Sequence, residues 1–538
     1  MTGSDVAVIG YGPTGMTLAA LLGQRGHRVV VLERYESLYN LPRAACFDDE
    51  IMRTFQKLGL TDAIGPGVVA QRDYDWINAG GQTLVELEYA EQGPGGWPAL
   101  YMMYQPHVET VLDDHVRALP TVEIRQGFTV TELGQDAGGV TLAGTGRGGA
   151  QTLRARYVVG ADGGSGLTRR KVCTSVDDYG FEENWLVCDF KMRRAVPGLP
   201  SFRQICDPAQ PTSIVRIGPD HHRFSFMLNP GETTAAATDP ARVWARVSPH
   251  LSQTDAELIR VANYMFRSRI AGQWRQGRVL LAGDAAHEMP PFLGQGMCSG
   301  IRDSHNLAWK LDLILNGRAD PALLDTYQQE REPHVRFITE KAIELGRVQT
   351  IRDPAAARAR DTRLTELRAT NQKPEKLGFP GLVGRMITGD GTFFPQGRVR
   401  AGHQSGRFDD VVGSGWCIVA SGTDTLSCIT GAQHAAWQAI GGRIAVIGTP
   451  NLPTARPTDL EDLGGTYTAW FARHRCVAAV VRPDWYAYGT ARDGAALAAL
   501  LDRLQASLQA EAVPGSALIP PPPQPGPPYA PPSAAGNL

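Results

Sequence analysis

The sequence lacks three features that mark common functional classes. Its eight cysteines are scattered and none forms a C-x-x-C pair, which excludes a zinc knuckle and a dithiol redox site. No apolar run approaches the roughly 20 residues that a membrane span needs. The formal net charge is -2, so electrostatics favours neither a nucleic-acid partner nor an anionic membrane.

Length and composition describe an ordinary globular protein. A chain of 538 residues is too long for one core, so we expect two or three domains. With 43% hydrophobic and 20% charged residues, the composition is typical of a folded chain. The first expected strand begins by about residue 5, which leaves no room for a signal peptide. Together with the scattered thiols, this predicts a cytoplasmic location.

A glycine-rich segment near the N-terminus predicts a dinucleotide site. The apolar run 5–10 leads into Gly10, Gly12 and Gly15, a helix-like stretch follows, and a second apolar run ends at Glu33. In such a β-α-β unit the glycines permit a tight turn, a close approach of backbone to a pyrophosphate, and close packing of helix on strand. The helix N-terminus attracts the phosphates, and the acidic residue can accept hydrogen bonds from ribose hydroxyls.

A second segment, far along the chain, predicts which dinucleotide binds. The apolar run 279–282 ends in Gly283 and Asp284, and Gly-Gln-Gly follows at 294–296. A carboxylate at the carboxyl end of such a strand can hold the ribityl hydroxyls of a flavin. Backbone N–H groups at the start of the next helix can face the flavin pyrimidine oxygens. The two segments together indicate FAD rather than a nicotinamide nucleotide alone.

A third strand end carries Asp162 and Gly163, after the apolar run 157–160. Its carboxylate can serve the cofactor, or it can cap a tight turn. No second glycine fingerprint occurs, so we expect a nicotinamide dinucleotide to bind transiently at the surface. Glu33 reports on FAD alone, so the sequence does not distinguish NADH from NADPH.

The remaining pattern predicts an α/β protein in which one domain interrupts another. The expected parts are a Rossmann-like FAD-binding domain in two pieces (1–180 and 271–350), an antiparallel β-sheet substrate-binding domain (181–270), a helical linker (351–394), a small α/β domain (395–512) and a Pro-rich tail (513–538). Residues 304–349 are expected to be one long helical stretch.

These segments resemble those of the class A flavoprotein aromatic hydroxylases, the group of para-hydroxybenzoate and phenol hydroxylases. The resemblance covers roughly residues 4–345 and the C-terminal domain, which is similar to the thioredoxin-like domain of phenol-hydroxylase relatives but lacks C-x-x-C. Within the group, the chain most resembles 3-(3-hydroxyphenyl)propionate hydroxylases. That similarity rests on Leu41-Pro42-Arg43-Ala44, Asp48-Asp49-Glu50, Gly95-Gly96-Trp97-Pro98, Phe224-Ser225-Phe226-Met227, Pro230-Gly231-Glu232 and residues 324–331.

The resemblance implies an FAD-dependent monooxygenase. In this group NADH or NADPH reduces the flavin, the reduced flavin adds O₂, and the resulting hydroperoxide transfers OH to an electron-rich phenol. We expect a 3-(3-hydroxyphenyl)propionate-like acid as substrate. The alternatives are a simpler phenol such as resorcinol, a polycyclic aromatic polyketide, and a flavin-binding scaffold without turnover. A homodimer is compatible with the resemblance, and no metal is expected.

The expected cofactor residues lie on the three strand ends and on positions that the resemblance adds. They are Gly10, Gly12, Pro13, Thr14, Gly15, Glu33, Arg34, Arg43, Gln105, Val130, Asp162, Gly283, Asp284, Pro291, Gly294, Gln295, Gly296 and Met297. The resemblance implies that Arg43 and Gln105 contact FAD, and that Asp162 also assists reduction by the nicotinamide. Two positions depart from the group: Gly166 replaces a usual serine, and Cys298 replaces a usual asparagine.

Substrate and catalytic residues are less well determined by the sequence. A general base should draw off the phenol proton, and the candidates are Asp48, Asp49 and His287, although His287 can instead pack beside the flavin strand. The substrate pocket is expected between the 180–230 sheet and the loop at 289–292. Its candidate lining is Trp185, Met227 and Phe292, and Arg203, Arg216 and Arg223 are candidates for binding a substrate carboxylate.

Overall fold

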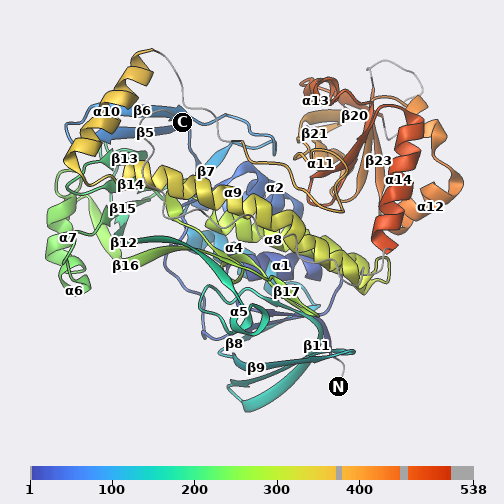
Figure 1. Cartoon of the computed structure of the whole chain (residues 1–538), viewed down its shortest axis with the longest axis horizontal. Helices are drawn as coiled ribbons and strands as arrows, with labels where there is room; N and C mark the ends of the chain where they lie inside the picture. The colour runs from blue at the N-terminus through green and yellow to red at the C-terminus, as the bar shows by residue number, and fades with distance from the viewer. Residues whose placement is uncertain (1–2, 371–377, 449–458, 510–538) are drawn as a thin grey trace.

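The structure is a computed structural model that describes residues 3–370, 378–448 and 459–509 (Figure 1). The Pro-rich tail expected at 513–538 lies outside the described residues. The mixed α/β architecture expected from the sequence is confirmed, and it is built from several sheets. None of the helices in the described ranges is long and apolar enough to cross a membrane.

The β-α-β unit predicted at the N-terminus forms as β1 (Ser4–Ile9), α1 (Pro13–Gly23) and β2 (Val29–Glu33). β1 lies parallel to β2 and to β11 (Gly149–Gly160), and β11 lies parallel to β18 (Val279–Leu281). The two distant segments predicted to serve one cofactor therefore end at the same edge of one sheet. The remaining strands of this sheet are β8 (Val122–Gln126), β9 (Thr129–Asp136), β10 (Gly139–Gly146) and β17 (Arg275–Gln276).

Helices α1, α4 (Gln105–Arg117), α8 (Gly296–Leu315) and α9 (Asp325–Gln349) pack around this sheet (Figure 1). The long helical stretch expected at 304–349 is two helices. Gly317 takes a left-handed φ of +68° directly after Asn316, which ends α8, and the chain turns before α9 begins. The shorter helices of this half are α2 (Asp49–Leu58), α3 (Thr61–Ile64) and α5 (Leu167–Val172).

A second, largely antiparallel sheet is built on two long strands, β12 (Val176–Met192) and β16 (Ala256–Ala271). The other strands are β5 (Asp73–Asn78), β6 (Thr83–Glu88), β13 (Phe202–Cys206), β14 (Thr212–Arg216), β15 (His221–Met227) and β19 (His287–Glu288), in the order β19-β16-β12-β15-β14-β13-β5-β6.

This second sheet extends beyond the residues 181–270 expected for it. β5 and β6 come from the segment 1–180, and β5 pairs in parallel with β13. The region also contains two helices, α6 (Thr234–Ala237) and α7 (Pro240–Val247), which cover one face of the sheet with an apolar core. Its other face is turned toward the first sheet. A short sheet of β3 (Cys46–Asp48), β7 (Leu100–Met103) and β4 (Val68–Ala70) lies between them.

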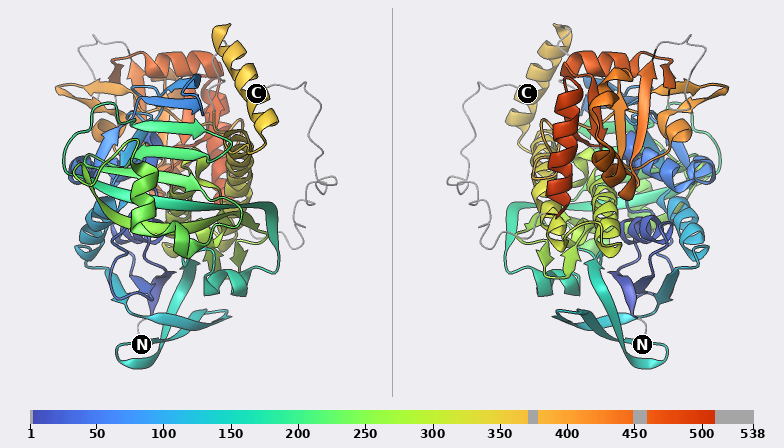
Figure 2. Two further views of the ribbon diagram at one scale, coloured as in Figure 1. Left: turned by 90° about the vertical axis from the view of Figure 1, so that its left-hand side faces the viewer. Right: turned by 90° about the vertical axis from the view of Figure 1, so that its right-hand side faces the viewer.

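The C-terminal part forms its own sheet beyond α10 (Pro354–Ala369). Its strands are β20 (Arg398–Ala401), β21 (Gln404–Arg407), β22 (Cys417–Ala420), β23 (Arg443–Gly448), β24 (Asp459–Asp462), β25 (Ala478–Val481) and β26 (Ala487–Ala491), in the order β21-β20-β24-β23-β22-β25-β26. Its helices are α11 (Phe408–Val412), α12 (Gly431–Ala439), α13 (Thr466–His474) and α14 (Gly494–Gln509). Figures 1 and 2 show these elements gathered at one end of the molecule.

Candidate functional site

A cavity of about 2750 Å³ runs from the carboxyl ends of β1, β2 and β11 to the open face of the second sheet. Open α/β sheets bind ligands at this edge. The cavity brings together most of the predicted cofactor residues: Gly10, Gly12, Pro13, Thr14, Glu33, Arg34, Arg43, Gln105, Val130, Asp162, Asp284, Pro291, Gly294, Gln295, Gly296 and Met297. The other two, Gly15 and Gly283, lie behind its wall.

The three glycines of the first segment differ in what surrounds them. Gly10 has a φ of +103°, and a Cβ there would overlap the carbonyl oxygen of Ala161. A Cβ at Gly15 would overlap the carbonyl oxygen of Gly10, so this glycine lets α1 pack on β1. A Cβ at Gly12 would meet no atom within 4 Å, and Gly12 borders the cavity. The open space beside Gly12, at the N-terminus of α1, fits a pyrophosphate.

Two carboxylates at strand ends, those of Glu33 and Asp284, face this cavity, and they differ in their hydrogen-bond partners. Glu33 accepts N–H groups from Tyr11 at 2.8 Å and Tyr35 at 2.9 Å, which fixes its position. The Asp284 side chain is exposed to the cavity, and desolvation by the surrounding protein raises its pKa. Among the described residues none donates a hydrogen bond to the Asp284 carboxylate. An unpaired carboxylate at this strand end fits the hydroxyls of a ribityl chain.

Asp162 explains one departure from the flavoprotein hydroxylase pattern. Its Oδ2 accepts the backbone N–H of Thr168 at 2.9 Å and the Thr168 hydroxyl at 3.0 Å, while its Oδ1 is buried without a partner in the described chain. Burial raises the pKa of Asp162. A Cβ at Gly166 would overlap the Asp162 carboxyl carbon. A side chain at position 166 would therefore displace Asp162 from this position, and Thr168 supplies the side-chain hydroxyl that Asp162 accepts.

We expect Gly166→Ser to weaken FAD binding rather than to improve it. The new Cβ must push Asp162 off Thr168, and overpacking of this kind costs about 1–3 kcal/mol. The FAD dissociation constant of the apoprotein should rise on the order of tenfold. Fluorescence titration of the apoprotein with FAD measures this change. Unchanged FAD affinity in Gly166→Ser would contradict this account of Asp162.

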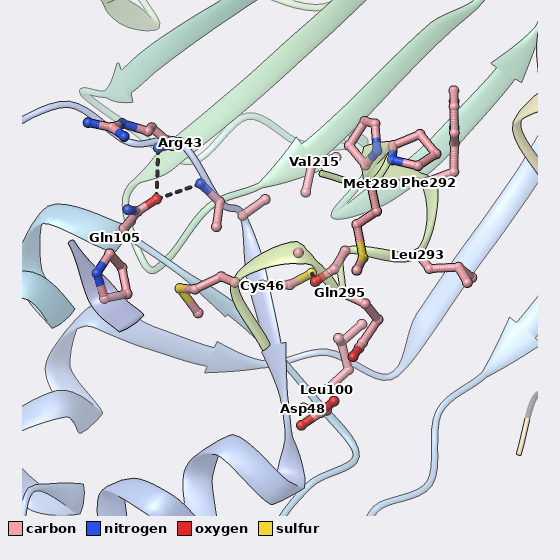
Figure 3. A pocket seen from close by; sticks show the side chains of 18 of the residues that line it. Arg43, Cys46, Asp48, Leu100, Gln105, Val215, Met289, Phe292, Leu293 and Gln295 are labelled. Carbon is pink, nitrogen blue, oxygen red and sulfur yellow. Dashed lines mark hydrogen bonds between the residues drawn. The ribbon is translucent and has the colours of Figure 1, made fainter. Parts of the chain in front are cut away.

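Two side chains hold the loops that border the cavity (Figure 3). Gln105 Oε1 accepts the backbone N–H groups of Arg43 at 2.9 Å and Ala44 at 2.5 Å, so it anchors the segment that carries Arg43. Gln295, at the start of α8, accepts a hydrogen bond from Arg302 Nη1 at 2.8 Å. The Cys298 thiol, at the second departure, donates to the carbonyl oxygen of Gly294 at 3.8 Å.

The three candidate bases occupy different places. Asp48 caps α2 and pairs with Arg302 at 2.5 Å, and it lines the cavity. Asp49 also lines the cavity, accepts the N–H of Gly95, and has its pKa raised to about 7 by burial and by Asp48. His287 is fully buried outside the cavity wall and bonds Asp303 through Nε2 at 2.6 Å. The suggestion that His287 acts directly on the substrate is therefore corrected.

The substrate candidates divide in the same way. Trp185 and Phe292 line the cavity with ring centroids 6.1 Å apart, and Arg203 lines it too. Met227 and Arg216 are not among the lining residues: Arg216 is on the face opposite to Ser213 and Val215, whereas Met227 is opposite Trp185 on the cavity-facing side of the sheet.

All three arginines proposed to bind a substrate carboxylate already have partners. Arg203 pairs with Asp75 through two bonds of 2.8 and 2.5 Å, and Arg216 donates to the carbonyl oxygens of Gly218 and Pro219. Arg223 pairs with Asp189 at 2.6 Å and also donates to the carbonyl oxygens of residues 42 and 43.

A row of polar residues was missed by the sequence reasoning. Gln204, Ser213 and Ser225 are register partners on β13, β14 and β15, and all three line the cavity. Ser225 stands between two phenylalanines, whereas Gln204 and Ser213 each have one polar neighbour, so the alternation along these strands is incomplete and only the register brings the three residues side by side. The one available signal is that alternation, which places polar residues on the core-facing side of three successive strands.

A parallel sheet whose strand ends open on a long cavity, beside a helix N-terminus and an unpaired carboxylate, defines a dinucleotide-binding protein. A family model described as an FAD binding domain matches residues 3–342, and an HcaD C-terminal domain model matches residues 391–507. The chain therefore belongs to the FAD-binding domain family of flavoproteins.

The chain is similar in sequence to two curated proteins that are described as hydroxylases. A probable NADH-specific resorcinol 4-hydroxylase of Rhodococcus jostii is 55% identical over 94% of this chain and 95% of its own length. A 3-(3-hydroxy-phenyl)propionate/3-hydroxycinnamic acid hydroxylase of Mycolicibacterium smegmatis is 35% identical over 89% of each chain.

Solved structures share the fold at lower identity. Aklavinone-11 hydroxylase in complex with FAD and aklavinone superposes with a TM-score of 0.75 at 23% identity, covering 93% of this chain and 99% of its own. The flavin-dependent monooxygenase PieE has a TM-score of 0.78 at 21% identity, with 94% and 99% covered. With the family match and the curated relatives, the chain is an FAD-dependent aromatic-ring monooxygenase.

Proposed function

We propose that the protein hydroxylates a small, uncharged dihydric phenol of the resorcinol type, with NADH as reductant. The observation that carries this proposal is the polar row Gln204, Ser213 and Ser225, in a sheet wall whose lining arginines, Arg203 and Arg223, are both paired with carboxylates. The name of the Rhodococcus relative supports both the substrate and the reductant. A 3-(3-hydroxyphenyl)propionate-like acid is the second candidate, supported by the more distant relatives.

The polar row is suited to two hydroxyl groups on one ring. Ser213 and Ser225 are directly opposed on neighbouring strands, and such residues place their Cβ atoms about 5 Å apart, comparable with the separation of two meta hydroxyls. The hydroxyls of Ser213 and Ser225 make no hydrogen bond within the described chain. The adjacent wall is apolar, with the rings of Tyr74 and Phe202 stacked at 3.8 Å. A ring against apolar side chains, oriented by a few polar groups, is typical of small-molecule sites.

The charges of the wall favour an uncharged substrate. Besides Arg203 and Arg223 of the sheet, Lys341 and Arg368 line this part of the cavity, and they pair with Glu344 and Glu86 at 2.8 Å. Against this part of the wall, a substrate carboxylate would have to break one of these pairs or remain buried without a counter-charge, which is costly. A neutral phenol meets no such penalty.

The residues of the chain then bind, orient and exclude water. When bound, FAD supplies the redox chemistry that activates O₂. The side chains of Met289 and Phe292 border the cavity between the start of α8 and the second sheet (Figure 3), where they keep water from the ring of the substrate. Asp49 faces the same cavity, and with a pKa of about 7 its ionised form, which can accept the phenol proton, predominates above that pH.

Three finer assignments are part of the proposal. The C-terminal domain is thioredoxin-like, which is supported by parallel β22 and β23, the antiparallel hairpin β25–β26 and the final helix α14. Its cysteines at 417, 428 and 476 are free, so it has no evident dithiol chemistry.

A cytoplasmic location is supported by the free cysteines. A homodimer remains a prediction, which a measurement of the mass in solution decides.

Binding of two phenols tests the proposed substrate. We expect resorcinol to perturb the absorbance of the FAD-loaded protein at lower concentration than 3-(3-hydroxyphenyl)propionate does. Ser213→Ala and Ser225→Ala should each weaken resorcinol binding about five- to tenfold, the loss expected for one hydrogen bond at a buried site, and leave FAD binding unchanged.

Ser268→Ala is the matched control for this titration. Ser268 is a buried serine of the same sheet, on β16, but it does not line the cavity, so its replacement should not affect resorcinol. Tighter binding of the propionate, or equal effects of Ser225→Ala and Ser268→Ala, would count against a resorcinol-type substrate.

A further inference from the structure

The C-terminal domain supplies part of the cavity wall. Thr392, Phe393 and Tyr486 line the same cavity as the predicted FAD residues. The inner face of the domain, with Ile418 and Val480, belongs to the same apolar core as β1 and α8. The domain is therefore packed directly against the cofactor-binding half of the chain.

Tyr486 is linked through the side chains of Glu50 and Arg302 to Gln295, at the start of α8. The Tyr486 hydroxyl donates to Glu50 at 3.3 Å, and Arg302 Nε donates to the same carboxylate at 2.7 Å. Arg302 Nη1 then donates to Oε1 of Gln295 at 2.8 Å, at the start of α8. Four residues from the C-terminal domain, α2 and α8 thus form one chain of hydrogen bonds, and all four border the cavity.

The charges around Arg302 do not cancel. Arg302 is 4% exposed and pairs with two carboxylates, Asp48 at 2.5 Å and Glu50 at 2.7 Å. Burial raises the pKa of Glu50, while Arg302 and Arg331 oppose that effect and Asp48 adds to it. A hydroxyl that donates to the carboxylate favours its ionised form. With both carboxylates ionised, the group formed with Arg302 carries one net negative charge; Asp49 lies beside this group, and the charge of Arg331 is paired with Asp303.

We propose that Tyr486 makes the C-terminal domain a working part of the FAD site, by holding Glu50 on Arg302 and so setting the position of Gln295 and the charge beside the flavin. Tyr486 is a positioning residue in this account, because it acts through Glu50 and Arg302. The inference concerns FAD binding and reduction, and it does not depend on which phenol is the substrate.

The tyrosine hydroxyl is not needed to attach the domain. Arg53 pairs with Asp409 at 2.8 Å and donates to the carbonyl oxygen of Phe394 at 2.8 Å. Arg482 pairs with Glu330 of α9 at 2.7 Å. These buried contacts join the same two parts of the chain and are untouched by Tyr486→Phe, so this variant should fold.

The test uses the full-length protein with Tyr486→Phe. Without the hydroxyl, Glu50 is protonated at a higher pH, the negative charge beside the flavin is lost, and reduced anionic flavin is stabilised. We expect the flavin midpoint potential to rise, with its pH dependence displaced upward, and the FAD dissociation constant to increase about two- to tenfold.

The matched control is Tyr467→Phe. The Tyr467 hydroxyl is equally buried in the C-terminal domain and accepts the backbone N–H of Gly397 at 2.9 Å, away from the cavity. Tyr467→Phe should lower the thermal unfolding midpoint without changing the flavin midpoint potential. If Tyr486→Phe has the potential and FAD affinity of wild type, or changes them no more than Tyr467→Phe does, the proposal is overturned.

A second background separates this mechanism from a general loosening of the domain. Glu50→Gln should raise the midpoint potential by itself and remove its dependence on this carboxylate. Adding Tyr486→Phe to Glu50→Gln should then change the potential no further, because the two residues act in series. An additive effect of the two substitutions would also overturn the proposal.

Discussion

Substitution of Gly12 by valine should abolish FAD retention while the apoprotein keeps its free energy of unfolding. Gly12 has an extended backbone, with φ of -91° and ψ of -175°, which valine adopts without strain. A Cβ there would meet no protein atom within 4 Å, so the apoprotein accommodates it. The branched side chain would instead fill the space beside the N-terminus of α1. We expect FAD affinity to fall at least on the order of a hundredfold, about 2.8 kcal/mol.

Gly10→Ala is the contrasting variant for this experiment. Gly10 needs a positive φ, and a Cβ there would overlap the backbone of Ala161, so the fold itself is strained. Chemical denaturation of the two apoproteins should show Gly10→Ala destabilised and Gly12→Val close to wild type, although both fail to retain FAD. If the Gly12→Val protein binds FAD normally, the pyrophosphate does not lie where we place it.

Glu330→Ala should lower the free energy of unfolding by about 3–5 kcal/mol, the cost of leaving buried cations without their partner. The Glu330 carboxylate accepts from Lys310 Nζ at 2.9 Å and Arg482 Nη2 at 2.7 Å, and all three side chains are fully buried. These residues join α8, α9 and the C-terminal domain. Glu123→Gln, which removes one partner of an exposed pair with Arg125, should cost less than about 1 kcal/mol.

The same carboxylate predicts a dependence of stability on pH. Burial would raise the pKa of Glu330, but Arg482 and Lys310 hold it below its usual value. A carboxylate whose pKa is depressed in the folded protein contributes stability above its unfolded pKa, about 4.3, and loses it as the pH falls through the folded value. The urea concentration at the unfolding midpoint should therefore decrease in wild type as the pH is lowered below about 4, and it should change less with pH in Glu330→Ala. Equal midpoints of the two proteins at pH 7 would refute this role of Glu330.

Local patterns in the sequence were sufficient to predict the strands and turns at the two glycine-containing segments of the first sheet. The run of glycines after β1 and the Gly283-Asp284 pair after β18 each combine an apolar strand with a turn, and both signals lie within a few residues. Parallel strands with such ends meet at one edge of a sheet, so the shared cavity could be anticipated. Gly166 could be noticed only as a departure, because the contact with Asp162 that requires it depends on the folded turn.

The substrate wall could not be derived in the same way, because it depends on register between distant strands. β5 pairs with β13 across more than a hundred residues, and that pairing brings Asp75 to Arg203 and cancels the charge that the sequence offered for a carboxylate. The row Gln204, Ser213 and Ser225 exists only in the folded sheet. The hydrogen-bond partner of His287 could not be predicted from the neighbouring residues in the sequence, because Asp303 lies on α8, sixteen residues further along the chain.

The most direct test of the account is NADH oxidation by the FAD-loaded protein in the presence of resorcinol, with the product identified by mass. We predict that resorcinol accelerates NADH oxidation, that the product is heavier by one oxygen atom, and that this atom derives from isotopically labelled O₂. Faster NADH oxidation without a hydroxylated product, while 3-(3-hydroxyphenyl)propionate is hydroxylated, would contradict the proposed substrate. Absence of any hydroxylated phenol would contradict the assignment as a monooxygenase.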